Sequence, residues 1–159
     1  VFAIGDLTDG PALAHKATAE AEVAAETACG QPAGFDPTSV PMIVFGDPQV
    51  LSVGLDRDEA AAAGLVATTG RFPFAASGRA RTLGDTEGFV EVVADEAGTV
   101  IGVHAVGAHV AELAGEAALA VETAATVEDL AGTIHAHPTM GESIMEAALG
   151  LTGRSPHRA

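Results

Sequence analysis

The sequence predicts an α+β protein in which an antiparallel sheet with flanking helices is preceded by a separate β-α unit. Two observations lead to this class. Several apolar runs of strand length lie in the middle of the chain, and residues 95–98 join two of them by a short polar turn that is typical of a β-hairpin. Helical spacing dominates only after these runs, and strands followed by helices favour an antiparallel sheet with helices on one side.

The first 34 residues form the predicted β-α unit. An apolar run at residues 1–4 is followed by a Gly-Asp turn and indicates a buried strand, while residues 12–28 are rich in Ala and Glu, which favours a helix. Residues 30–37 then contain too many Gly and Pro residues for either element. We therefore divide the chain into a β-α unit at 1–34, a linker at 35–40, a main domain at 41–152 and a tail at 153–159.

The main domain begins with the strands of the predicted sheet. Apolar runs indicate strands at residues 42–45, 50–55, 65–74, 89–94 and 100–106. After the second strand, Asp56 and Glu59 have the spacing of a capping box, which predicts a short helix that ends at Gly64.

Three further helices are expected after the strands. Residues 110–122 show helical spacing, and Thr126 is expected to cap the next, short helix. The last helix is expected to start at Pro138 and Thr139. Its apolar face at helical spacing comprises Ile144, Met145, Ala148 and Leu151.

The charge balance excludes two classes of partner. Seven Lys and Arg residues stand against 22 Asp and Glu residues, which gives a formal net charge of −15. Nucleic acids and anionic membranes recruit clusters of basic residues, so we expect neither as a partner. The acidity exceeds what solubility needs, and we interpret it as halophilic adaptation to a salt-rich cytoplasm, where screening removes self-repulsion.

Cysteine content and hydropathy point to a cytoplasmic protein. Cys29 is the only cysteine, so no disulfide can form within the chain. No apolar run of about 18 residues is present, and the start of the chain lacks the basic region of a signal peptide. The chain starts with Val1 rather than Met, and we expect it to be a fragment of a longer protein.

The strongest signal for chemistry is the run from His135 to Glu142, which contains a second histidine, His137. A carboxylate that is bonded to one imidazole nitrogen fixes the tautomer and stabilises the imidazolium, as acid–base catalysis requires. Two alternatives stay open at this stage. Thr139 and Glu142 also have the spacing of a capping box, and the two histidines could share a metal, although no further ligand lies nearby.

A second candidate site lies at the end of the first predicted strand. Asp6 has the position at which a carboxylate holds a ribose or ribityl hydroxyl beside a helix N-terminus, and His15 and Lys16 could meet a phosphate or a flavin edge. Alternatively, Asp6 caps the next helix and the two basic residues face water. The Gly-x-Gly-x-x-Gly dinucleotide fingerprint does not occur in the sequence.

Taken together, several segments resemble the C-terminal part of the dihydrolipoyl dehydrogenase family, within the FAD- and NAD-linked disulfide oxidoreductases. The run His-Pro-Thr-x-x-Glu at residues 137–142 is shared with glutathione reductases, whereas residues 13–17 and 135–139 look most like dihydrolipoyl dehydrogenases. The matching segments are residues 3–6, 13–17, 41–55, 72–80, 102–104 and 135–142.

This resemblance implies a role for each part of the chain. Residues 1–34 would be the last strand and helix of an FAD-binding domain, with Asp6 on the ribityl chain and the backbone of Leu13, Ala14 and His15 near the flavin ring. The main domain would be the dimerisation domain of a homodimer. A lipoyl-bearing acyltransferase of a 2-oxo acid dehydrogenase complex would be a further partner.

The resemblance also implies the chemistry. His137 would be the acid–base group that enters the partner subunit's active site, and Glu142 would orient it, in an enzyme that uses FAD and NAD to oxidise dihydrolipoamide. A glutathione-reductase-like or transhydrogenase-like enzyme is the alternative. Because the redox cysteine pair and the FAD fingerprint are missing from these residues, we expect the 159 residues alone to be inactive and to retain no cofactor.

Overall fold

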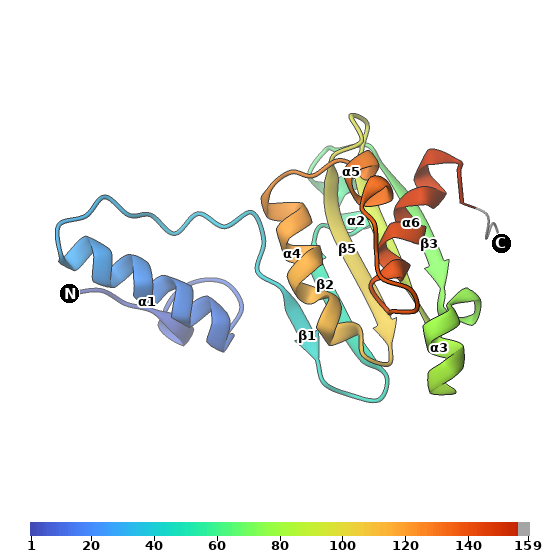
Figure 1. The fold of residues 1–159 in the computed structure, drawn as a ribbon. Helices are drawn as coiled ribbons and strands as arrows, with labels where there is room; N and C mark the ends of the chain where they lie inside the picture. The colour runs from blue at the N-terminus through green and yellow to red at the C-terminus, as the bar shows by residue number, and fades with distance from the viewer. Residues whose placement is uncertain (156–159) are drawn as a thin grey trace. The chain divides into compact units, whose positions relative to one another are not determined.

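The computed structural model describes residues 1–155 and divides the chain into two compact units, Val1–Val40 and a second that begins at Pro41. Figure 1 shows the helices and strands of each unit. No helix within residues 1–155 is long and apolar enough to cross a lipid bilayer.

The first unit consists of a single turn of 3₁₀ helix, η1 (Gly5–Leu7), and the helix α1 (Ala14–Ala28). The strand predicted at residues 1–4 is wrong. The backbone there leads into Ile4 in an extended conformation, with φ −144° and ψ 162°, but no other strand in the described residues pairs with it. An apolar run becomes a strand only when a neighbour accepts its hydrogen bonds.

The second unit is built on a five-stranded antiparallel sheet of order β1-β2-β5-β4-β3. The predicted strands and the predicted hairpin are confirmed, with ends that differ by one or two residues from those expected. The strands are β1 (Met42–Val44), β2 (Gln49–Gly54), β3 (Ala67–Pro73), β4 (Gly88–Asp95) and β5 (Val100–Gly107).

Helices pack on one face of this sheet, as the sequence predicts. In Figure 1, α4 and α6 lie across the sheet with α5 beside them. The helix α4 contacts β2 and β5, α6 contacts β3 and β4, and α5 packs against α6. The helices of the unit are α2 (Arg57–Ala62), α3 (Gly78–Leu83), α4 (Ala114–Glu122), α5 (Val127–Gly132) and α6 (Glu142–Thr152), with 3₁₀ turns η2 (Phe74–Ala76) and η3 (Val110–Leu113).

Local signals explain where the short helices start. Asp56 and Glu59 form the reciprocal capping box that their spacing predicts at α2, and Thr126 forms one with Asp129 at α5. The helix expected at residues 110–122 is divided into η3 and α4. The last predicted helix, α6, begins at Glu142, which is four residues later than the expected start at Pro138.

The core lies between the sheet and the helix layer. Alternate residues of the strands point into it, because successive side chains of a strand face opposite sides. The helices contribute small residues and a few larger ones. Fully or almost fully buried members include Leu51 and Val53 of β2, Val90 and Val92 of β4, Val103 and Ala105 of β5, Ala117 of α4, and Ile144 and Ala147 of α6.

Candidate functional site

The predicted acid–base pair is assembled in the segment that connects α5 to α6. Nδ1 of His137 lies 2.8 Å from Oε1 of Glu142, the first residue of α6. The His137 side chain is 75% exposed, whereas that of Glu142 is 22% exposed. The carboxylate is therefore held by the protein, and the imidazole projects from it toward solvent.

Glu142 serves a second group with its other oxygen. The backbone N–H of Thr139 donates to Oε2 of Glu142 at 2.7 Å. The reciprocal half of a capping box is absent, because the Thr139 hydroxyl donates to the carbonyl oxygen of Ala136 and Gly141 is the N-cap of α6. The expectation that Thr139 caps the last helix is therefore wrong, although Glu142 does bind the Thr139 N–H.

The electrostatic surroundings keep Glu142 ionised. Burial alone would raise the pKa of the Glu142 carboxyl, but the hydrogen bonds from the Thr139 N–H and the His137 imidazole, with the charges of His137 and His135, outweigh it. The pKa consequently lies below its ordinary value. An ionised carboxylate can only accept hydrogen bonds, so His137 donates through Nδ1.

This arrangement leaves Nε2 of His137 available for proton exchange. No hydrogen-bond partner faces that nitrogen among residues 1–155. Nε2 can take up a proton from a bound group, and Glu142 then stabilises the imidazolium that forms. A pocket of about 170 Å³ adjoins the pair; it is lined by Phe72, Ala76, Ser77, Gly78, His137, Glu142 and Glu146.

The structure separates the two histidines of the motif. His135 does not face Glu142; its Nε2 lies 2.7 Å from Oε1 of Glu116 on α4, and its Nδ1 lies 3.0 Å from the carbonyl oxygen of Thr133. Within the described part of the chain, no group of three or more His, Cys, Asp and Glu side chains has the arrangement of a metal site.

The candidate flavin-side residues all lie in the first unit. Asp6 is exposed in η1, and Leu13 is the N-cap of α1, which Ala14 and His15 begin. No side chain caps the start of α1. The elements η1 and α1 are in contact, so the structure brings Asp6 and the start of α1 into one small unit.

Buried charges that sequence reasoning missed tie η1 to α1. Nζ of Lys16 lies 2.8 Å from Oε1 of Glu20, and both side chains are buried. The other oxygen of Glu20 accepts from the Gly5 N–H, and the Thr8 hydroxyl donates to Oε1 at 2.7 Å. Hydrogen bonds from Lys16 and Thr8 lower the pKa of Glu20 to about 2, despite the opposing effect of burial. The i,i+4 spacing of Lys16 and Glu20 was a usable signal for the pair.

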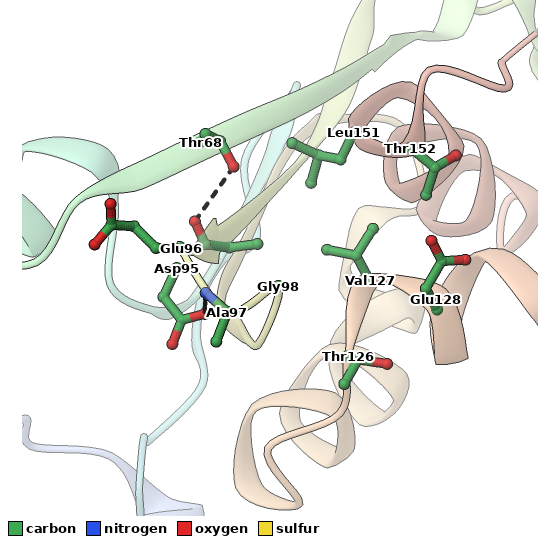
Figure 2. Close-up of a pocket in the computed structure, with 11 residues that line it drawn as sticks. Thr68, Asp95, Glu96, Ala97, Gly98, Thr126, Val127, Glu128, Leu151 and Thr152 are labelled. Atoms are coloured by element: carbon green, nitrogen blue, oxygen red, sulfur yellow. Dashed lines mark hydrogen bonds between the residues drawn. The ribbon is translucent and has the colours of Figure 1, made fainter.

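A larger pocket, of about 420 Å³, lies at the other end of the sheet, beside the β4-β5 turn (Figure 2). Several of its polar groups already have structural partners. Oδ1 of Asp95 accepts from the N–H groups of Ala97 and Thr99, and the Thr68 hydroxyl donates to the carbonyl oxygen of Ala94. We therefore place the candidate site at His137 and Glu142 rather than here.

The fold and the His137 site define a class of protein, and comparison with known families identifies it. Residues 40–148 match the dimerisation domain of the pyridine nucleotide-disulphide oxidoreductases, and the chain belongs to this family. Curated relatives are dihydrolipoyl dehydrogenases. Those of Halobacterium salinarum and Geobacillus stearothermophilus are 54% and 47% identical over 158 residues, which are 99% of this chain and 33% and 34% of the relatives.

Solved structures confirm the fold. LpdA from Mycobacterium tuberculosis superposes with a TM-score of 0.86 at 31% identity, over 94% of this chain and 33% of that protein. The HOCl-induced flavoprotein disulfide reductase RclA from Escherichia coli gives a TM-score of 0.82 at 24% identity, over 89% of this chain and 33% of that protein, which shows the fold alone. The chain spans about a third of the length of the relatives that it matches.

Proposed function

We propose that this chain supplies His137 and Glu142 as an acid–base pair to a dihydrolipoyl dehydrogenase, in which FAD and NAD carry electrons away from dihydrolipoamide. One observation carries the proposal: His137 is held through Nδ1 by an ionised carboxylate, while Nε2 is left without a protein partner in the described residues. The similarity to curated dihydrolipoyl dehydrogenases over nearly the whole chain supports the choice of substrate.

His137 would act by moving one proton. Nε2 removes the proton from a substrate thiol, and the resulting thiolate is the species that attacks a disulfide. Glu142 stabilises the imidazolium while the proton stays on Nε2, and His137 can later release that proton from the same nitrogen. When bound, FAD would supply the two-electron redox chemistry that links oxidation of the thiols to reduction of NAD.

The first unit fits a role beside the flavin. The exposed carboxylate of Asp6 can accept a hydrogen bond from a ribityl hydroxyl. No side chain caps the start of α1 at Leu13, Ala14 and His15, and the positive end of the helix dipole there favours an electron-rich ring. We infer that residues 1–34 are the end of an FAD-binding domain.

Pairing of two subunits completes the proposal. The family to which this domain belongs forms homodimers, and we infer that residues 41–152 pair in this way. The projecting imidazole of His137 is suited to enter the active site of the partner subunit. A lipoyl-bearing acyltransferase would deliver the substrate in the cytoplasm, and neither a membrane nor a nucleic acid is needed as a partner.

Replacement of His137 tests the proposal. Residues 1–159 are grafted in place of the matching part of the Halobacterium salinarum dihydrolipoyl dehydrogenase, and dihydrolipoamide-dependent NAD reduction is measured. We expect His137→Gln to lower turnover on the order of 10²–10⁴-fold, because the acid–base group is lost. A loss below tenfold would contradict the assignment of His137.

Two controls sharpen this experiment. His109→Asn replaces an exposed histidine at left-handed φ by a residue that tolerates this conformation, and should leave turnover unchanged. The ungrafted 159-residue chain should show neither activity above a buffer blank nor a flavin absorption band. Activity with glutathione disulfide but not with dihydrolipoamide would favour a different disulfide reductase.

A further inference from the structure

A second histidine–carboxylate pair lies next to the proposed acid–base pair and differs from it in burial. Nε2 of His135 is 2.7 Å from Oε1 of Glu116, and the His135 side chain is 8% exposed, against 75% for His137. The pair joins residues 19 positions apart, so only the packing of α4 beside the segment that leads to α6 brings them together.

Both ring nitrogens of His135 are hydrogen-bonded within the protein, so neither is available for proton exchange with a substrate. Nδ1 lies 3.0 Å from the Thr133 carbonyl oxygen, which can only accept, so Nδ1 carries a proton and donates it. Nε2 faces the Glu116 carboxylate, and the proton between these two atoms is used in that contact. Both nitrogens of His135 are therefore occupied within the protein, whereas His137 has one occupied nitrogen.

The pair connects the catalytic segment to the core. Glu116 lies on α4, and the next residue of this helix, Ala117, is fully buried under the sheet. On the other side, a Cβ placed on Gly141 would lie 3.5 Å from Cδ2 of His135 and 3.8 Å from Oε2 of Glu116. The pair thus packs against the backbone just before Glu142 and holds the chain just before His137.

We propose that Glu116 is a positioning residue, which acts through His135 to fix the segment that carries His137 opposite Glu142. The proposal rests on the proposed function for its catalytic meaning, but the positioning itself is a property of the 159-residue chain. Loss of the Glu116 carboxylate frees residues 133–141 to move, and the 2.8 Å contact between His137 and Glu142 then loosens although neither residue has been changed.

NMR of the histidine side chains in the 159-residue chain tests this directly. In wild-type protein at pH 8, the neutral form of His137 should be the Nδ1–H tautomer, because Glu142 accepts that proton. In Glu116→Ala, the ratio of the Nδ1–H to the Nε2–H tautomer should fall on the order of tenfold, as the hydrogen bond to Glu142 is lost. An unchanged ratio in a folded Glu116→Ala variant would overturn the proposal.

Two further variants separate positioning from a general loss of structure. Glu116→Gln keeps a side chain that can bond Nε2 of His135 and should retain the wild-type tautomer of His137; the same fall as in Glu116→Ala would overturn the proposal. Glu112→Ala removes an exposed carboxylate from the preceding turn and should have no effect. These spectra do not depend on turnover, so they can fail while the proposed function stands.

A measurement on the wild-type protein tests the contacts of His135 without the need for a folded variant. Ring N–H protons of His135 should be observed in the wild-type spectrum, because both ring nitrogens are hydrogen-bonded and the side chain is only 8% exposed. Those of His109, which is exposed, should be lost to exchange. Exchange of the His135 ring protons as fast as those of His109 would overturn the proposal even if Glu116→Ala does not fold.

Discussion

Hydrogen bonding at the two ring nitrogens distinguishes His137 from His104 and His135. His104 has Nδ1 3.0 Å from the Ser52 hydroxyl and Nε2 3.2 Å from the Leu55 carbonyl oxygen, and His135 is likewise bonded at both nitrogens. His137 is bonded at Nδ1 alone within the described residues. A histidine that is bonded on both sides supports structure, whereas one with a free nitrogen can exchange a proton.

Ser143, next to Glu142, is predicted to weaken the domain. Its side chain is fully buried, and its hydroxyl has no hydrogen-bond partner in the described structure. An unpaired buried hydroxyl costs about 1 kcal/mol or more, so Ser143→Ala should raise the free energy of unfolding by about that amount and Tm by about 3 °C. Thermal unfolding followed by circular dichroism measures both quantities.

Ser77 provides the matched comparison for Ser143. It is also buried, but its hydroxyl oxygen accepts from the Ala80 N–H at the start of α3. Ser77→Ala should therefore lower the free energy of unfolding by about 1 kcal/mol, as for other N-caps. If Ser143→Ala lowers Tm as Ser77→Ala does, the Ser143 hydroxyl has a partner and the prediction is wrong.

At the scale of elements, two helices on one face of the sheet hold the two histidine–carboxylate pairs. The helix α6 begins with Glu142 and packs on β3 and β4, and α4 carries Glu116 and packs on β2 and β5. The position of each pair therefore depends on how its helix packs on the sheet. Small residues control the approach of α6 where it crosses β3.

Gly70 on β3 is predicted to be required for the close packing of α6. A Cβ at this position would lie 2.2 Å from the Ala147 carbonyl oxygen and 2.8 Å from Cγ of Leu151. The helix must shift to make room, so Gly70→Ala should lower the free energy of unfolding by about 1–3 kcal/mol, the usual cost of overpacking. Urea unfolding measures this change.

Gly150 on the facing helix is the control for Gly70. A Cβ there makes only ordinary contacts, at 3.8 Å or more, and alanine favours a helix. Gly150→Ala should therefore leave stability unchanged or raise it by up to about 1 kcal/mol. Equal stability of Gly70→Ala and wild type would show that α6 is not held at this distance by Gly70.

The Glu20 network predicts that the first unit is sensitive to acid. The pKa of Glu20 is lowered from its ordinary value of 4.5 to about 2 in the folded chain. Ionised Glu20 therefore stabilises the folded state fully at pH values above about 4.5. This contribution is lost as the pH falls from about 4.5 to 2. Residue-resolved NMR of α1 should show loosening over this range in the wild type and a flatter, already weakened profile in Glu20→Gln.

Glu26, an exposed residue of the same helix, provides the control for Glu20. Glu26→Gln should keep the wild-type acid profile of α1, since the side chain takes no part in the network that joins η1 to α1. An acid profile of Glu20→Gln that coincides with that of the wild type would contradict the assigned role of Glu20.

At the scale of the whole molecule, features that are decided by the local sequence were predicted better than features that depend on long-range contacts. Apolar runs, the hairpin turn, the capping box at Asp56 and the cap at Thr126 placed the sheet and the short helices, because each is decided within a few residues. The strand predicted at residues 1–4 is wrong because a strand forms only when its backbone pairs with another segment. The His137–Glu142 contact follows from a spacing of five residues, whereas Glu116 reaches His135 only through packing of α4.

The surface charge of the whole molecule predicts that salt stabilises it. With 22 acidic and seven basic residues, the folded chain repels itself, and the Debye length falls from about 30 Å at 0.01 M to 3 Å at 1 M salt. Tm should therefore rise steadily with KCl over this range. Three exposed carboxylates, Glu26, Glu96 and Glu112, provide a test of the cause. Their joint replacement by Gln should raise Tm at low salt and make its dependence on KCl shallower, whereas a Tm that does not change with KCl would exclude charge repulsion as a determinant of stability.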